Sequence, residues 1–409
     1  MSGDPHPIDE RGRSPRVILV SGKGGVGKTT FASSTGVACA RRGLRTMVMS
    51  VDIAHSLSDS FGLTEHLLNI HGGRPYRIAD NLDIQEVDLQ AEIKQHWGDL
   101  YGSLSTLLKS SGMNNVLAEE LAILPGMPEV VCLLYISKYL RENTYDVIVL
   151  DCAPTGESMR FISLPSTIEW SLQKVYKLKE NVPSIAQPLL RIMGVTPIGD
   201  LEELEKFRSI YTHLNSIRET LLDTAITSVR LVCTPEKMVI NETLRAYMYF
   251  CLYGMNVDMV LINKIVPDEA NNGYFDQMVK DQAGYIDEIN SHFQPAKTLQ
   301  VRSFSREVIG LKSLESMACD IFGNHAPNAI FSEEPPYQFE DINGDKLLRI
   351  KLPSVNKEHI ELFNDREYLV VRVGNFKRHV CLPRMFLNMK PCVANFNDGW
   401  LSIRFADAG

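Results

Sequence analysis

The chain has 409 residues, of which 44% are hydrophobic, and it carries a formal net charge of −8 at pH 7. This length accommodates one large α/β domain and a smaller second one. The acidic balance argues against binding to phosphate backbones, and no apolar run approaches the ~18 residues that span a bilayer. We therefore expect no nucleic acid among its partners and no stable membrane insertion.

Residues 1–15 are polar and rich in proline, so we expect a flexible tail that is neither a secretory signal nor a transit peptide. The eight cysteines lack the spacing of a disulfide framework or a zinc knuckle and stand in apolar surroundings, at positions 39, 132, 152, 233, 251, 319, 381 and 392. This distribution indicates buried thiols in a soluble protein of a reducing compartment.

A phosphate-binding loop is the strongest local pattern. Residues 17–20 predict a buried strand of a parallel sheet, a glycine cluster follows, and the sequence from Lys28 onward can be helical. The glycines let backbone N–H groups turn toward anionic oxygens at a helix N-terminus. Lys28 would reach the β- and γ-phosphates, and the Thr29 hydroxyl would ligate Mg²⁺. The residues expected to contact ATP are Gly22, Lys23, Gly24, Gly25, Val26, Gly27, Lys28, Thr29 and Thr30.

The alternative is a glycine-rich turn that binds nothing, and the order of strand, loop and helix disfavours it. Residues 31–42 predict that helix, and residues 46–51 predict a second strand that ends at Asp52. This order predicts an α/β fold with a doubly wound parallel sheet, whose ligands lie at the carboxyl ends of the strands.

Asp52 follows the second strand directly and could polarise a water for in-line attack on the γ-phosphate. It could also be a structural cap, whereas a ribose-binding role is disfavoured by the Lys-Thr pair of the loop. Residues 89–141 have helical periodicity with a break at 125–129, and residues 146–151 form an apolar strand that ends in Asp151. Downstream of a phosphate loop, Asp151 is expected to hold the Mg²⁺ water shell opposite Thr29.

Several segments together resemble the ArsA family, which includes arsenite-pump ATPases and ATPases that guide tail-anchored membrane proteins: residues 21–30, 52–61, 125–126, 151–165 and 232–236. The resemblance covers residues 16–323 and implies a P-loop NTPase fold of the deviant Walker A type. It implies that Lys23 contacts the nucleotide of the other subunit, so that hydrolysis depends on a homodimer. A solvated lysine on an exposed loop is the alternative. Asp52 would lie in the first switch, and residues 151–156 would form the second.

The resemblance also implies a base contact and a client. Asn263 ends the predicted strand 258–263 and matches the family position whose amide reads the adenine edge, although a turn-forming strand end would have the same sequence. Residues 166–222 are helical in pattern and would form an apolar groove for the hydrophobic helix of a membrane-protein client. Ordinary core packing is the alternative for any one apolar residue there.

Three features depart from the family pattern. Ile53 replaces the proline that usually follows Asp52, and Glu157 replaces a histidine after Gly156, so the switches could respond differently to nucleotide. Residues 264–272 lack the two-cysteine motif by which many members share a zinc ion across the dimer. A zinc-bridged dimer is therefore not expected.

The periodicity changes from helical to alternating after a predicted linker at residues 331–337. Strand patterns and the hairpin signals at 343–344 and 397–399 predict a small β-sandwich over residues 338–409. This segment resembles the α-crystallin domain of small heat-shock proteins, although a passive β appendage is the alternative. Following an ATPase domain at 16–330, it resembles the plant and cyanobacterial subclass, which implies the plastid stroma, with the cytoplasm as the alternative.

We thus expect an ATP-hydrolysing homodimer that acts as a targeting factor or chaperone for membrane-protein segments. An arsenite-transport ATPase is disfavoured because the chain has one ATPase half and no evident counterpart of the arsenite-binding thiols. The acidic charge and the terminal β-domain disfavour a partitioning or membrane-surface ATPase. A holdase or scaffold with a structural nucleotide is the alternative from another class.

Overall fold

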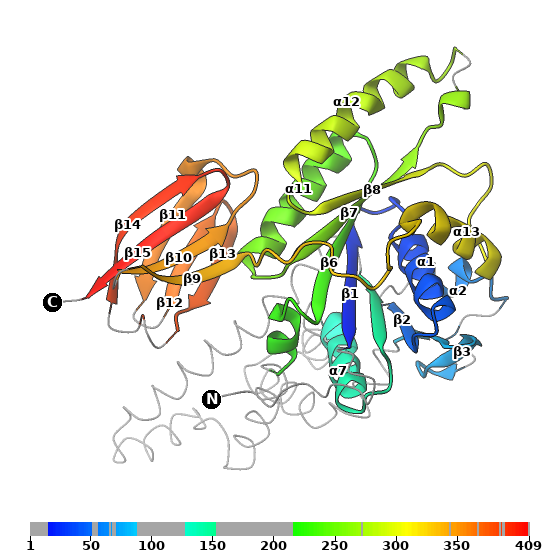
Figure 1. Ribbon diagram of the computed structural model, residues 1–409, viewed down its shortest axis with the longest axis horizontal. Coiled ribbons are helices and arrows are strands. Elements are labelled where there is room, and N and C mark those ends of the chain that lie inside the picture. Colours follow the sequence, from blue (N-terminus) through cyan, green and yellow to red (C-terminus); the bar gives the residue numbers. More distant parts are fainter. Residues whose placement is uncertain are drawn as a thin grey trace, which may run out of the picture.

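The computed structural model describes residues 15–50, 56–64, 67, 71–87, 127–152, 216–270, 273–342, 345–365, 368–383, 386 and 389–407. These residues form an α/β unit and a C-terminal all-β unit (Figure 1). The predicted combination of the two fold classes is therefore confirmed.

An eight-stranded sheet forms the centre of the α/β unit, in the order β3-β4-β2-β5-β1-β6-β7-β8. Its strands are β1 (Arg16–Gly22), β2 (Thr46–Ser50), β3 (Tyr76–Ala79), β4 (Leu82–Glu86), β5 (Val147–Asp151), β6 (Thr227–Cys233), β7 (Val257–Ile265) and β8 (Lys297–Arg302). All neighbours are parallel except β3 and β4 at one edge. Every residue of β1, β2, β5 and β6 is buried, as expected for parallel strands covered on both faces.

Helices cover both faces of this sheet. Figure 1 shows α1 (Lys28–Arg41) and α13 (Leu311–Phe322) together on one side, and α11 (Lys237–Leu252) and α12 (Asp276–His292) on the other. Further helical elements include α2 (Ser56–Ser60), α7 (Met127–Arg141), the 3-10 turns η1 (Asp268–Ala270) and η2 (Lys357–His359), and the helical residues 216–222. In the described part of the chain, no helix combines the length and apolar character that crossing a membrane requires.

Two buried arginines fasten the segment after α13 to the sheet. Arg16 at the start of β1 donates from Nε to the carbonyl oxygen of Asn328 (3.1 Å). Arg230 on β6 donates to the carbonyl oxygens of Pro327 (2.6 Å) and Ala329 (3.0 Å). We call residues 327–332 the strap. The strap is held at four of its backbone carbonyl oxygens by side chains of the α/β unit, the fourth bond coming from Asn256.

The charge of Arg230 is balanced inside the same unit. Its Nε lies 3.6 Å from Oδ1 of Asp258 on β7, and neither side chain is exposed to solvent. Oδ2 of Asp258 accepts a hydrogen bond from the backbone N–H of Phe331 (3.2 Å), whose ring lies 5.1 Å from the Arg230 guanidinium. The strap therefore completes the surroundings of a buried ion pair.

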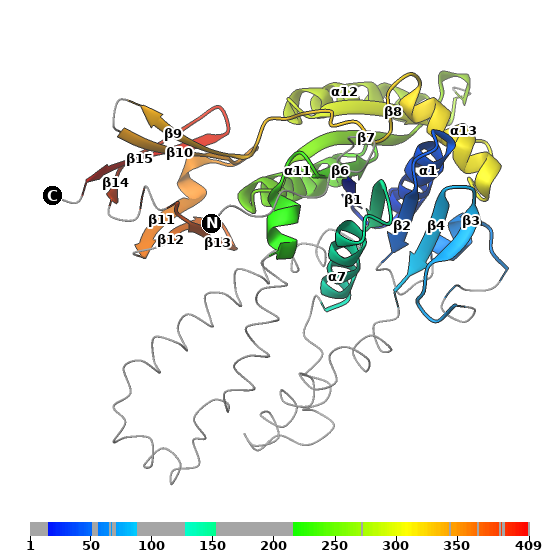
Figure 2. The ribbon, with the colours of Figure 1, turned by 60° about the horizontal axis from the view of Figure 1, so that its bottom comes forward.

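The C-terminal unit consists of two antiparallel sheets, in the orders β14-β15-β10-β9 and β11-β12-β13. The strands are β9 (Tyr337–Ile342), β10 (Asp345–Lys351), β11 (Ile360–Asp365), β12 (Tyr368–Val373), β13 (Phe376–Cys381), β14 (Met389–Asn397) and β15 (Trp400–Asp407). Figure 2 shows the two sheets as separate layers. Buried side chains from both layers include Leu348, Ile350, Leu369, Val371, Leu401 and Ile403. This is the architecture of the predicted β-sandwich.

The hairpin signal at residues 397–399 lies where it was predicted, between β14 and β15. Asp398 and Gly399 have φ angles of 51° and 75°. Two consecutive residues of positive φ match the twist of the flanking strands, and aspartate followed by glycine tolerates that conformation.

Aromatic contacts join the sandwich to the C-terminal half of α11. The Tyr249 ring lies 5.0 Å from the Phe376 ring of β13, and the Tyr253 hydroxyl donates to the carbonyl oxygen of Lys377 (3.2 Å). Lys351 of β10 pairs with Glu334 (2.6 Å) and lies 5.8 Å from the Tyr247 ring. Since α11 begins four residues after β6 ends, one helix connects the carboxyl edge of the large sheet with the sandwich.

Candidate active site at the phosphate loop

The loop between β1 and α1 has the backbone that a phosphate cradle requires. Gly25 and Gly27 have φ angles of 81° and 97°, in the left-handed region that favours glycine. A Cβ added to Gly27 would lie 2.4 Å from Nδ2 of Asn263, whereas one added to Gly24 would meet no atom within 4 Å. The loop is thus packed tightly on its sheet side at Gly27 and is open at Gly24.

Replacing Gly27 by Ala should destabilise the protein and weaken ATP binding. The left-handed backbone costs about 1–3 kcal/mol for a residue with a side chain, and the new methyl group would also displace Asn263. Unfolding midpoints and equilibrium binding of ATP measure the two effects. Gly24→Ala is the matched control and should keep the unfolding midpoint; equal midpoints for the two variants would contradict this account.

Thr29 and Asp151 meet at the expected magnesium position. The Thr29 hydroxyl donates to Oδ2 of Asp151 at 2.6 Å, although the two residues lie 122 positions apart in sequence. They meet because β1 and β5 are parallel neighbours, with Val20 opposite Asp151. A hydroxyl and a carboxylate supply the hard oxygen ligands that Mg²⁺ prefers, so the donor set fits this ion.

Lys28 lies at the N-terminus of α1, and its Nζ donates to the carbonyl oxygen of Lys23 (3.2 Å). This hydrogen bond holds the Lys28 ammonium group against the backbone of the loop. Backbone N–H groups at a helix start and a lysine beside them attract phosphate oxygens. The side chain of Lys23 is partly exposed, and Val26 within the loop is buried.

Strand β7 anchors the loop from the other side. Asn263 donates from Nδ2 to the carbonyl oxygen of Val26 (2.7 Å) and accepts from the backbone N–H of Lys264 (2.8 Å). Lys264 donates from Nζ to the carbonyl oxygen of Gly25 (2.7 Å). The two bonds of Asn263 use half of the hydrogen-bonding capacity of a side-chain amide, which leaves one N–H and one lone pair for a base.

Sequence reasoning missed Lys264 and Ser56 as neighbours of the loop. Ser56, the first residue of α2, places its Oγ 3.4 Å from Oγ1 of Thr29. Lys264, the penultimate residue of β7, has a positive φ of 56°. Neither contact follows from the loop sequence, because each depends on the strand order: β2 and β7 are each separated from β1 by one strand. Asp52 and the second-switch residues 153–156 lie outside the described residues.

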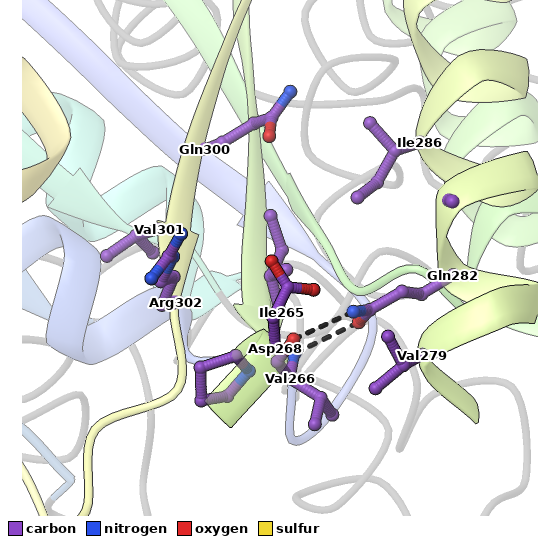
Figure 3. A pocket seen from close by; sticks show the side chains of 11 residues that line it. Ile265, Val266, Asp268, Val279, Gln282, Ile286, Gln300, Val301 and Arg302 are labelled. Carbon is purple, nitrogen blue, oxygen red and sulfur yellow. Dashed lines mark hydrogen bonds between the residues drawn. The ribbon is translucent and has the colours of Figure 1, made fainter. Parts of the chain in front are cut away.

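A cavity of about 310 Å³ adjoins these anchors (Figure 3). Its lining comes from the carboxyl ends of β7 and β8, from η1 and from α12. Figure 3 shows the Gln282 amide reaching from α12 to the backbone of Val266, where it donates to the carbonyl oxygen (2.7 Å) and accepts from the N–H (3.0 Å). These two hydrogen bonds fix the backbone just after Asn263 and Lys264. They therefore support indirectly the two residues that anchor the phosphate loop.

Two thiols of the α/β unit have raised pKa values because they are buried. Burial raises the pKa of Cys233, at the carboxyl end of β6, to about 12, and it has the same effect on Cys39 in α1. A thiol with so high a pKa stays protonated at neutral pH and is neither a nucleophile nor a good metal ligand. The chemistry of this site therefore belongs to the lysines, hydroxyls and carboxylates.

A glycine-rich loop between a parallel strand and a helix, with Lys28 at the helix start and a Thr29–Asp151 pair, defines a P-loop nucleoside triphosphatase. Residues 15–323 match the family model for the ArsA ATPase, described as an anion-transporting ATPase. Residues 343–405 match an HSP20-like domain found in ArsA. The chain belongs to the ArsA ATPase family and is an ATPase, as predicted from residues 16–323.

Relatives support this assignment along nearly the full chain. "Putative arsenical pump-driving ATPase 1" of Aquifex aeolicus is 43% identical over 92% of this chain and 96% of its own length. A protein of similar name from Chlorobaculum tepidum is 36% identical over 95% of this chain and 96% of its own length. "ATPase get3" of Aspergillus terreus is 27% identical over 74% of this chain and 89% of its own length.

Proposed function

We propose that the protein is a homodimeric ATPase that captures hydrophobic helical segments of tail-anchored membrane proteins in an apolar groove and releases them according to its nucleotide state. The observation that carries this proposal is the loop with two lysines, Lys23 and Lys28, inside a family that includes get3 ATPases. The groove would be formed by residues 166–222, most of which lie outside the described residues.

The proposed reaction is hydrolysis of ATP to ADP and phosphate. Lys28 and the loop N–H groups would bind the β- and γ-phosphates, and Mg²⁺, when bound, would neutralise phosphate charge from Thr29 and Asp151. Asp52 would orient the attacking water. Lys23 would supply positive charge to the nucleotide of the partner subunit, and Asn263 would contact adenine.

A second candidate is an ATPase that drives an arsenical pump, because the relatives at 43% and 36% identity carry that name. Trivalent arsenic binds clusters of reactive thiols. The cysteines of the described residues do not have this arrangement. Five of the cysteines are buried, namely Cys39, Cys132, Cys152, Cys233 and Cys251. The exposed pair, Cys319 and Cys392, is divided between α13 of the ATPase unit and β14 of the sandwich. The thiol positions therefore favour the first candidate.

Steady-state hydrolysis by the full chain, measured alone, with a hydrophobic helical peptide and with arsenite, separates the candidates. We expect turnover, peptide binding in one nucleotide state and peptide release in another, and no response to arsenite. Asp52→Asn is the matched control, because it should bind ATP and peptide but fail to release the peptide. Stimulation by arsenite alone would favour the pump-driving role, and peptide binding without turnover would indicate a holdase.

The proposed site of action is the soluble phase of a reducing compartment, which is the plastid stroma by resemblance to the plant and cyanobacterial subclass, with the cytoplasm as the alternative. Wild-type turnover by a Lys23→Ala variant, or by a protein that stays monomeric with ATP, would contradict the role of Lys23 in the partner's site.

A further inference from the structure

Helix α2 is a small element that touches the phosphate loop and is held by three different parts of the fold. Its first residue, Ser56, lies 3.4 Å from Oγ1 of Thr29. At its other end, the Ser60 hydroxyl donates to Oγ of Ser33 in α1 (3.0 Å), and the Ser60 carbonyl accepts from the N–H of Gly310 (2.9 Å). The position of α2 therefore decides how Ser56 meets Thr29.

The third support is a buried carboxylate, that of Glu86. Glu86 is the last residue of β4, is 2% exposed, and accepts a hydrogen bond at Oε1 from the backbone N–H of Ser58 (2.9 Å). The N–H groups in the first turn of a helix have no partner within the helix, and a carboxylate also complements their positive charge. Burial of a carboxylate is costly unless such bonds satisfy it. An apolar side chain would fill the same space without the cost of burying a charge, so packing alone does not explain a carboxylate at this position.

Sheet geometry explains why β4 can reach this site. β4 pairs in parallel with β2, with Glu86 opposite Ser50, and Ser50 is opposite Asp151 on the next strand. The Glu86 carboxylate therefore lies at the same carboxyl edge of the sheet as the Thr29–Asp151 pair. Its hydrogen bond to Ser58 connects it to α2, whose first residue contacts Thr29.

We propose that Glu86 is a positioning residue for ATP hydrolysis, which fixes α2 through Ser58 and so holds Ser56 against the hydroxyl of Thr29. Loss of the oxygen that accepts from Ser58 lets α2 shift and disturbs Thr29 on its magnesium side. The proposal rests on the ATPase activity of the family and does not depend on the identity of any client.

The test compares Glu86→Ala, Glu86→Gln and Glu86→Asp with a neighbouring control, Gln85→Ala. Gln85 is also fully buried and bonded, donating to the carbonyl oxygen of Gly73 (2.7 Å) and accepting from the Tyr139 hydroxyl (2.8 Å). As the adjacent strand residue it points to the opposite face of the sheet from Glu86. Its loss should lower stability in a comparable way without releasing α2.

For Glu86→Ala we expect kcat to fall about 10- to 100-fold. This is the usual loss when a residue that positions a metal ligand, without binding the metal itself, is removed. The Mg²⁺ concentration for half-maximal activity should rise, and the KM for ATP should change little. Glu86→Gln keeps an oxygen acceptor at the same reach and should retain most activity. Gln85→Ala should lower the unfolding temperature but keep kcat and the Mg²⁺ dependence.

Wild-type kcat and Mg²⁺ dependence in Glu86→Ala would overturn the proposal, as would an equal loss of kcat in Gln85→Ala. If Glu86→Ala does not fold, the two conservative variants decide. The shorter Glu86→Asp side chain withdraws from Ser58, so its kcat should be below that of Glu86→Gln, and the reverse order would refute the positioning role.

Discussion

Replacing Lys28 by Ala is expected to lower kcat for ATP hydrolysis by ~10²–10³-fold, the usual loss when one preorganised donor to a developing charge is removed. Lys28 is held over the loop by its bond to the Lys23 carbonyl oxygen, at the N-terminus of α1. Without the ammonium group, the transferring phosphoryl would lose the one lysine that its own subunit is proposed to supply. Phosphate release at saturating ATP and Mg²⁺ measures the effect.

Lys264→Ala is the matched control for Lys28→Ala. Lys264 also donates its Nζ to a loop carbonyl oxygen, that of Gly25, but it comes from β7 and its bond anchors the backbone. Its loss should cost far less turnover than the loss of Lys28. Equal losses in the two variants would show that loop anchoring, and not charge at the phosphates, accounts for the effect of Lys28.

Replacing Arg230 by Met should destabilise the α/β unit by about 3–5 kcal/mol, the cost of leaving one partner of a buried ion pair behind. Burial lowers the pKa of the Arg230 guanidinium and the charge of Asp258 opposes that shift, so the two side chains depend on each other. The variant also loses the bonds to the carbonyl oxygens of Pro327 and Ala329. Denaturant unfolding measures the loss, and faster proteolysis within the strap reports its release.

The double variant Arg230→Met with Asp258→Leu provides the control. Replacing both members of a buried pair by apolar groups is often close to neutral, so it should regain most of the stability lost in Arg230→Met. A double variant no more stable than the single one would mean that the strap hydrogen bonds, and not the unpaired carboxylate, dominate.

Strands that the sequence did not predict lie mainly at edges or in the sandwich. β8 alternates exposed and buried residues at the edge of the large sheet, and β14 is exposed along most of its length. β8 and β14 bury little apolar surface, and the buried β4 carries the polar residues Asp83, Gln85 and Glu86, so all three lack the continuous hydrophobic run that predicted β1 and β5. Their existence depends on hydrogen bonds to a neighbouring strand, which sequence periodicity does not report.

The sequence by itself determined the phosphate loop, the strands that end near Asp52 and Asp151, and the hairpin at residues 397–399, because each depends on neighbouring residues and local backbone preference. Only the tertiary structure decided which distant groups converge there. Lys264 reaches the loop from more than two hundred residues away, and Asn263, which the family resemblance assigned to adenine, also anchors the loop backbone. Glu86 reaches α2, and α11 reaches the sandwich, because strand order and helix packing are set by burial over the whole chain and not by spacing along it.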